Sequence, residues 1–104
     1  MNAFEQAAEA FLTRRGYCVI DRNYRAPGGE IDLVAREGPV LCFVEVRARR
    51  SSRFGTPEET VGPQKQRRLR LAAARYLAEH GAADCRFDVV AMTPEGIRLI
   101  KHAF

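Results

Sequence analysis

The chain has 104 residues, enough for one domain with a single hydrophobic core but not for two. Its hydrophobic content of 46% excludes a disordered chain, and no apolar run reaches the roughly 18 residues of a membrane-spanning helix. The first ten residues carry Glu5 and Glu9 where a signal peptide has positive charge, so we expect a cytoplasmic protein with no membrane partner.

The formal net charge of +4 is unevenly distributed. Residues 46–75 contain nine basic residues against Glu58 and Glu59, a net charge of +7, which leaves −3 for the rest of the chain. A solvated helix face explains part of this charge but explains poorly the arginines that follow a strand. The asymmetry favours an anionic partner, and nucleic acid is the usual one. The residues expected to contact it are Arg47, Arg49, Arg50, Arg53, Lys65, Arg67 and Arg68.

The first element in chain order is a helix, predicted over residues 3–15 by the helical spacing of apolar side chains. Its apolar stripe comprises Phe4, Ala7, Ala8, Phe11 and Leu12. Glu5 and Glu9 lie one turn apart on the flank of this stripe, near the positive end of the helix dipole. A strand over residues 17–23 follows, and the composition of residues 25–29 predicts a turn.

Two apolar, β-branched runs between residues 30 and 47 predict an antiparallel hairpin. Strand alternation places Glu30 and Asp32 on one face of its first strand and Glu45 and Arg47 on one face of its second. A connection over residues 37–40 sets Asp32 directly opposite Glu45, whereas a two-residue connection sets the pair diagonally on the same face.

Two neighbouring carboxylates on an apolar hairpin repel each other and are costly to desolvate. A divalent cation with oxygen ligands would compensate for this cost. Ion pairs with Arg36 and Arg47 on a half-solvated sheet face would do the same. Both interpretations are open on the pattern of Asp32 and Glu45 alone.

The second half of the chain predicts a long connection over residues 48–62, a helix over residues 63–80 with Pro63 in its first turn, and strands over residues 87–92 and 97–100. The helix buries Leu69, Ala72, Ala73, Tyr76 and Leu77. The order α-β-β-β-α-β plus an edge strand predicts a single α/β domain over residues 1–104, with a central mixed sheet flanked by helices. The third strand, about residues 40–47, is expected at its centre.

This element order, with an acid on the second strand and Glu-x-basic on the third, resembles the restriction-endonuclease-like superfamily. More closely, the chain is similar to the YraN family of small bacterial proteins, which are described as endonuclease-related. The resemblance covers essentially the whole chain. The matching segments include Gly29-Glu-Ile-Asp-Leu-Val-Ala35, Phe43-Val-Glu-Val-Arg47, Lys65, Arg86-Phe-Asp-Val-Val90 and Ala103-Phe104.

The resemblance implies a nuclease that hydrolyses phosphodiester bonds of DNA with Mg²⁺ or Mn²⁺. It places the metal ligands at Asp32, Glu45 and the main-chain carbonyl of Val46. It also matches Glu5 to a helix acid that assists the metal or its water. Lys65 lies at the start of the second predicted helix and would reach the same site, where a helix N-terminus beside a phosphate is favourable. The expected catalytic residues are therefore Glu5, Asp32, Glu45, Arg47 and Lys65.

Residue 47 is where the chain departs from the pattern, which has lysine there. Arginine stays charged and cannot act as a base, although Arg47 can stabilise transition-state charge or clamp the phosphate. Three functions therefore stay open: a metal-dependent nuclease, a nuclease-like fold that binds nucleic acid without cutting it, and an adaptor that contacts another protein. A homodimer is also compatible with the sequence.

Overall fold

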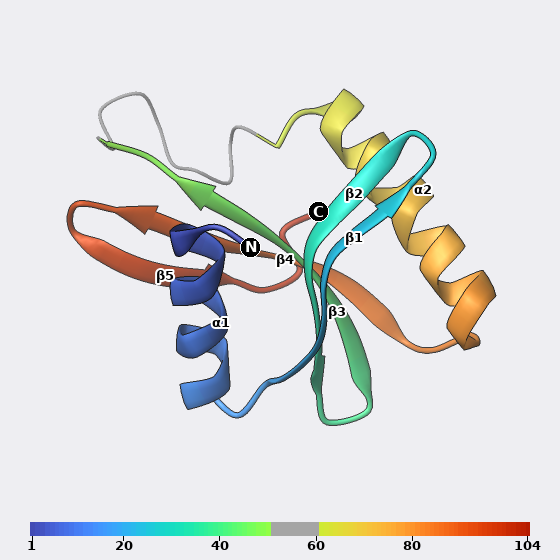
Figure 1. Ribbon diagram of the computed structural model, residues 1–104, viewed down its shortest axis with the longest axis horizontal. Coiled ribbons are helices and arrows are strands. Elements are labelled where there is room, and N and C mark those ends of the chain that lie inside the picture. The colour runs from blue at the N-terminus through green and yellow to red at the C-terminus, as the bar shows by residue number, and fades with distance from the viewer. Residues whose placement is uncertain (51–60) are drawn as a thin grey trace.

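The computed structural model describes residues 1–50 and 61–104, and its central element is the strand β3, Val40–Ala48. β3 pairs antiparallel with β2 (Gly29–Glu37) and parallel with β4 (Cys85–Thr93). β1 (Cys18–Ala26) and β5 (Gly96–Ile100) extend the two edges in antiparallel pairing, so that the strand order is β1-β2-β3-β4-β5 (Figure 1). The predicted mixed sheet with the third strand at its centre is confirmed.

Two helices cover opposite faces of this sheet, because successive strand residues point to opposite faces and each set has its own partner helix. The cluster under α1 (Ala3–Arg14) contains Ala8, Phe11, Leu12, Leu33, Cys42, Val44 and Val90. The cluster under α2 (Pro63–His80) contains Val34, Leu41, Phe43, Leu69, Ala72, Tyr76 and Val89. β3 is buried on both faces, which explains its continuous apolar run. Within the described residues, no helix has the length and apolar character to cross a membrane.

The first turn of α1 is fixed by a capping box. The Asn2 side chain accepts a hydrogen bond from the Glu5 N–H at 2.8 Å, and the Glu5 carboxylate accepts one from the Asn2 N–H at 3.1 Å. The predicted apolar stripe is wrong at Phe4 and Ala7, which are exposed. The helix instead turns the face with Glu5 and Ala8 towards the sheet, which leaves Glu5 only 8% exposed and Phe4 56% exposed.

The hairpin between β1 and β2 is tighter than predicted. Only Pro27 and Gly28 form its turn, so β1 runs on to Ala26 and the predicted turn over residues 25–29 is too long. Gly28 has a φ of 86°, a conformation that glycine adopts without strain. Gly29 touches α2: a Cβ there would lie 2.2 Å from the Arg68 carbonyl oxygen. The tip of this hairpin therefore rests directly on the helix backbone.

The hairpin between β2 and β3 has the register that matters for the site. Glu37 pairs with Val40, and Gly38 and Pro39 alone form the turn. The ladder ends at the pair Leu33–Val44, so Asp32 and Glu45 directly follow its last pair and are not themselves a ladder pair. The register of this ladder is the one expected for a connection over residues 37–40, although the turn itself has only two residues.

Candidate metal and nucleic-acid site

The backbone ladder between β2 and β3 gives way to a side-chain contact at Asp32. The Val46 N–H donates a hydrogen bond to Asp32 Oδ2 at 2.8 Å. Because the N–H and C=O of one strand residue point to the same side, the Val46 carbonyl faces Asp32 as well. The three positions expected to ligate a metal are thus adjacent.

A cavity of about 330 Å³, here called the acidic cavity, opens beside these groups. The first turns of both helices and the strands β2 and β3 supply its walls. Its lining residues are Asn2, Phe4, Glu5, Asp32, Glu45, Val46, Arg47, Ala48 and Lys65. All the residues predicted as catalytic therefore line one cavity, although four separate elements contribute them.

Like charges in the acidic cavity perturb the titration of Asp32. Burial raises the pKa of Asp32 to about 7, and the charge of Glu45, a hydrogen bond between the two carboxyl groups and the charge of Glu5 add to this rise. The hydrogen bond from the Val46 N–H acts in the opposite direction without cancelling it. Near neutral pH Asp32 is therefore only partly ionised, and a nearby cation would favour its charged form.

Two cations accompany Glu45, whose side chain is 4% exposed. Arg47 Nη1 and Lys65 Nζ each lie 3.4 Å from Glu45 Oε2. These distances are long for charge-assisted hydrogen bonds, which are usually about 2.7–2.9 Å. Both cations keep partly exposed side chains at the cavity, so they are positioned to contact an anion that enters it.

The donor atoms fit a small, hard cation. In residues 1–50 and 61–104, no three side chains of His, Cys, Asp or Glu gather into a metal-binding group. Glu5 lines the cavity, but its carboxylate caps α1. The donors suited to a cation are consequently Asp32, Glu45 and the Val46 carbonyl. An all-oxygen set with two carboxylates suits Mg²⁺ or Mn²⁺, and Mg²⁺ keeps several waters and needs few protein ligands.

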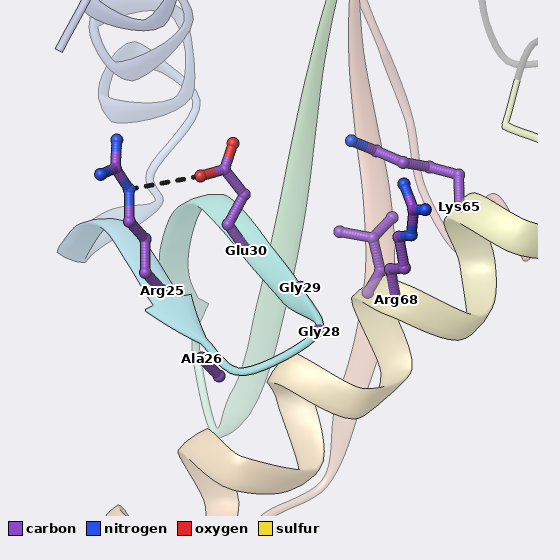
Figure 2. Close-up of a pocket in the computed structure, with 8 residues that line it drawn as sticks. Arg25, Ala26, Gly28, Gly29, Glu30, Lys65 and Arg68 are labelled. Carbon is purple, nitrogen blue, oxygen red and sulfur yellow. Dashed lines mark ion pairs between the residues drawn. The ribbon is translucent and has the colours of Figure 1, made fainter.

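Two hollows adjoin the acidic cavity and contain part of the predicted basic surface. The strand-end hollow, about 410 Å³, is lined by Val46, Arg47, Ala48 and Arg49. The hairpin hollow, about 490 Å³, lies between the β1–β2 hairpin and α2 (Figure 2). Its lining residues are Arg25, Ala26, Gly28, Gly29, Glu30, Lys65, Arg68 and Leu69. Lys65 belongs to both the hairpin hollow and the acidic cavity, which connects the two.

The remaining predicted contacts to nucleic acid are less closely grouped. Arg50 and Arg67 are exposed but are not among the residues that line the acidic cavity or the two hollows. Arg53 lies outside the described residues. Arg25 was not predicted, although it precedes a Pro-Gly-Gly turn. Only the contact between this turn and α2 brings Arg25 to the same hollow as Arg68.

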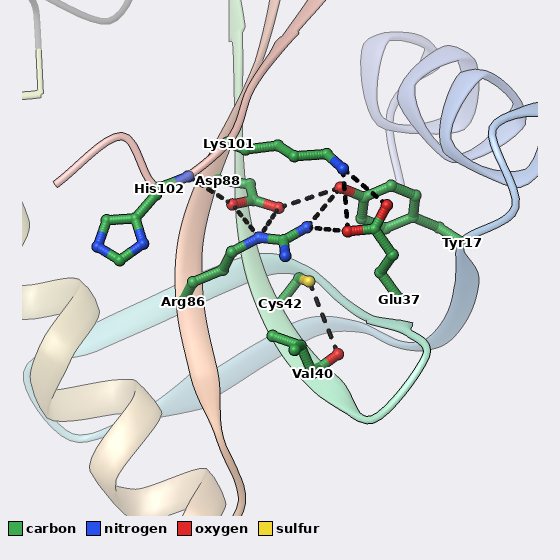
Figure 3. Close-up of polar contacts among 8 residues, drawn as sticks. All are labelled: Tyr17, Glu37, Val40, Cys42, Arg86, Asp88, Lys101 and His102. Carbon is green, nitrogen blue, oxygen red and sulfur yellow. Dashed lines mark hydrogen bonds and ion pairs between the residues drawn. The ribbon is translucent and has the colours of Figure 1, made fainter.

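A buried polar cluster was also not predicted (Figure 3). Asp88 is fully buried and accepts hydrogen bonds from Arg86 Nε and from the His102 N–H, both at 2.9 Å. Arg86 Nη2 donates to the Tyr17 hydroxyl at 2.7 Å and to Glu37 Oε1 at 2.6 Å. The cluster thus ties β4 to the α1–β1 connection, the end of β2 and the C-terminal segment.

This polar cluster has the character of a structural element. Within the described part of the chain, every buried side-chain nitrogen and oxygen has a hydrogen-bond partner. Burial raises the pKa of the neighbouring Cys42 thiol to about 11, so this thiol stays protonated and unreactive at neutral pH. Burial likewise raises the pKa of Tyr17.

Fold and site together define a mixed-sheet α/β domain with a carboxylate pair between two helix N-termini. Residues 4–92 match the sequence model of a family described as "Uncharacterised protein family UPF0102". The chain is 53% identical to a UPF0102 protein of Symbiobacterium thermophilum, over 98% of this chain and 92% of that one. It is 49% identical to a UPF0102 protein of Moorella thermoacetica, over 96% of this chain and 90% of that one. The chain belongs to the UPF0102 family, which is the YraN family that its motifs resemble.

Proposed function

We propose that this protein binds DNA and hydrolyses phosphodiester bonds with Mg²⁺ or Mn²⁺ as cofactor. The observation that supports this best is the common cavity of the carboxylates Asp32 and Glu45 and the cations Arg47 and Lys65. Phosphodiester hydrolysis needs negative groups that hold a metal and positive groups that hold the phosphate. The cavity brings both kinds of group together.

The proposed roles follow from the contacts of each residue. Asp32, Glu45 and the Val46 carbonyl would hold the cation, and the Val46 N–H fixes the orientation of the Asp32 carboxylate. When bound, the cation would neutralise charge on the phosphate and make water more acidic. Arg47 and Lys65 would exchange their long contacts with Glu45 for hydrogen bonds to phosphate oxygens.

Calorimetric titration with Mn²⁺ and a cleavage assay on duplex, branched and single-stranded DNA test this proposal. Wild type should bind Mn²⁺ and cut DNA only with Mg²⁺ or Mn²⁺ present. Asp32→Ala should abolish detectable Mn²⁺ binding and lower cleavage by more than about 100-fold. Glu79→Ala is the matched control, because it removes an acid from the surface of α2 that pairs with Arg75. Equal Mn²⁺ affinity in wild type and Asp32→Ala would leave the carboxylates a structural role only.

A second candidate function is nucleic-acid binding without cleavage, and Arg47 favours it. The superfamily pattern has lysine at this position, and arginine cannot accept a proton from water. This function predicts salt-dependent DNA binding with no metal-dependent cleavage by wild type. Arg47→Lys separates the two candidates further, because it restores the pattern and should raise cleavage only if the site is catalytic. An absence of DNA binding even at low salt would favour the adaptor instead.

A further inference from the structure

We propose that the hairpin hollow is a phosphate subsite, in which Arg25 and Arg68 hold the sugar-phosphate strand next to the acidic cavity. This inference rests on the proposed function and extends it. It identifies a second binding position for the strand. It also assigns a binding role to Arg25, which lies outside the basic segment of residues 46–75.

The walls of the hairpin hollow are fixed by direct backbone contact. Gly29 lies so close to α2 that a Cβ at this position would be 2.2 Å from the Arg68 carbonyl oxygen and 2.9 Å from its carbonyl carbon. No side chain separates the hairpin from the helix there, so Arg25 and Arg68 are held on either side of one opening. Figure 2 shows Arg25 and Glu30 on the hairpin, and Lys65 and Arg68 on the helix across from them.

The charge of the hairpin hollow suits an anion. Arg25, Lys65 and Arg68 line it, with Glu30 as the single acid among its lining residues. Arg25 Nε lies 3.4 Å from Glu30 Oε2, and these side chains are 80% and 52% exposed, so solvent weakens the pair. Lys65 forms an ion pair with Glu45 in the adjoining cavity, at 3.4 Å.

The start of α2 adds to this positive potential. The helix has no acidic residue in its first turn, and its N-cap residue, Gly62, offers no side chain to cap the helix. The positive end of the helix dipole therefore lacks a carboxylate partner within its own first turn. Lys65 and Arg68 project from the first two turns into the hairpin hollow, where a phosphate would meet both the side-chain charges and the dipole.

The position of the hollow indicates which anion it receives. Lys65 lines both the hairpin hollow and the acidic cavity, while Arg47 lines both the acidic cavity and the strand-end hollow. A basic position thus lies on each side of the carboxylate pair. A strand whose reacting phosphate occupies the acidic cavity would place a neighbouring phosphate in the hairpin hollow. The ligand class is consequently a phosphate of a nucleic-acid strand, either internal or terminal.

The first test compares Arg68→Ala with Arg75→Ala, which removes the same charge from an exposed position further along α2, outside the hollow and not among the expected contacts. Binding of a fluorescent DNA oligonucleotide is measured by anisotropy over a salt series, in metal-free buffer so that no strand is cut. Arg25→Ala and Arg68→Ala should each reduce the salt slope by about 1, and the double variant by about 2. Arg75→Ala should stay close to wild type. Circular dichroism of each variant checks that the fold is intact.

The second test locates the phosphate. A single uncharged methylphosphonate linkage is moved along the oligonucleotide. At the position whose phosphate occupies the hairpin hollow, the uncharged linkage should weaken binding to wild type but not to the double variant Arg25→Ala/Arg68→Ala. Sensitivity only to a terminal phosphate would assign the subsite to a strand end. Equal losses in Arg68→Ala and Arg75→Ala, with no sensitive phosphate, would overturn the inference and leave the proposed function standing. A wild type that binds no DNA at low salt would overturn both.

Discussion

Asp32 lies between a hydrogen-bond donor that favours its charge and a carboxylate that opposes it. The Val46 N–H donates to one of its oxygens, while burial and Glu45 raise its pKa to about 7. A hairpin stabilised only by packing gains nothing from such a pair. The cation proposed above would explain the arrangement, because both carboxylates could share it.

The raised pKa of Asp32 makes the stability of the metal-free protein pH-dependent. Unfolded, this carboxyl titrates near its ordinary pKa of about 3.9, so between about pH 4 and 7 the folded state binds more protons than the unfolded state. The free energy of unfolding must therefore fall as pH rises through this window. We expect Asp32→Asn, which still accepts a bond from Val46, to lose most of this fall. At pH 8 it should be more stable than wild type by about 1–3 kcal/mol.

Urea unfolding in EDTA from pH 4 to 8 measures this difference. The other ionisable residues are the same in both proteins, so their contributions cancel in the comparison. A pH dependence that is unchanged in Asp32→Asn would mean that the carboxylate pair is not under electrostatic strain.

The exposure of Phe4 gives a second prediction about single residues. Leu12 is fully buried between α1 and the sheet, whereas Phe4 of the same helix is 56% exposed. We expect Leu12→Ala to lower the free energy of unfolding by about 2–5 kcal/mol and Phe4→Ala to change it by less than about 0.5 kcal/mol. Equal losses of unfolding free energy in the two variants, measured by chemical denaturation, would mean that Phe4 belongs to the hydrophobic core.

At the scale of elements, local sequence patterns predicted what local forces determine. The bounds of α2, the alternation along β3, and the grouping of Asp32 with Glu45 follow from periodicity and turn residues. Along β2 the predicted alternation is wrong at Ile31, which packs in the cluster under α2, whereas Leu33 and Ala35 pack in the cluster under α1. The orientation of α1 did not follow, because Phe4 and Leu12 both fit an apolar stripe and only the capping box and the sheet choose between faces. Arg25 was missed for the same reason, since its neighbour across the hollow belongs to another element.

The polar cluster links segments that no local pattern connects, and it gives a prediction about how the elements are joined. Arg86→Ala would leave Asp88, which is fully buried, without its charged partner. We expect it to lower the free energy of unfolding by about 3–5 kcal/mol. Lys101→Ala is the control, because its pair with Glu37 is half exposed and contributes less than about 1 kcal/mol. Similar effects of the two variants would mean that the cluster is solvated rather than structural.

At the scale of the whole molecule, basic residues are concentrated in one segment of the chain, and the fold places several of them around the acidic cavity. The basic segment carries +7, and from it Arg47, Arg49, Lys65 and Arg68 line the acidic cavity or the hollows beside it. Composition predicts that the partner carries negative charge. It could not predict which cations reach the opening, since that depends on the contact between the hairpin and α2.

This distribution predicts a strong salt dependence of DNA binding. Each phosphate contact releases counterions, so affinity should fall steeply with salt and depend little on base sequence. Arg49→Ala, at the strand-end hollow, should reduce the salt slope by about 1. An unchanged slope in binding isotherms at several salt concentrations would remove Arg49 from the proposed contacts.

The central claim is that Asp32 and Glu45 hold a divalent cation, and the most direct measurement is thermal unfolding at pH 8 over a Mn²⁺ series. A ligand that binds only the folded state stabilises it by about 2.7 kcal/mol at 100 times its Kd. The Tm of wild type should therefore rise continuously with Mn²⁺, whereas the Tm of Asp32→Asn, which starts higher, should not change. A wild-type Tm that does not change with Mn²⁺, or an equal rise of Tm in both proteins, would contradict the claim.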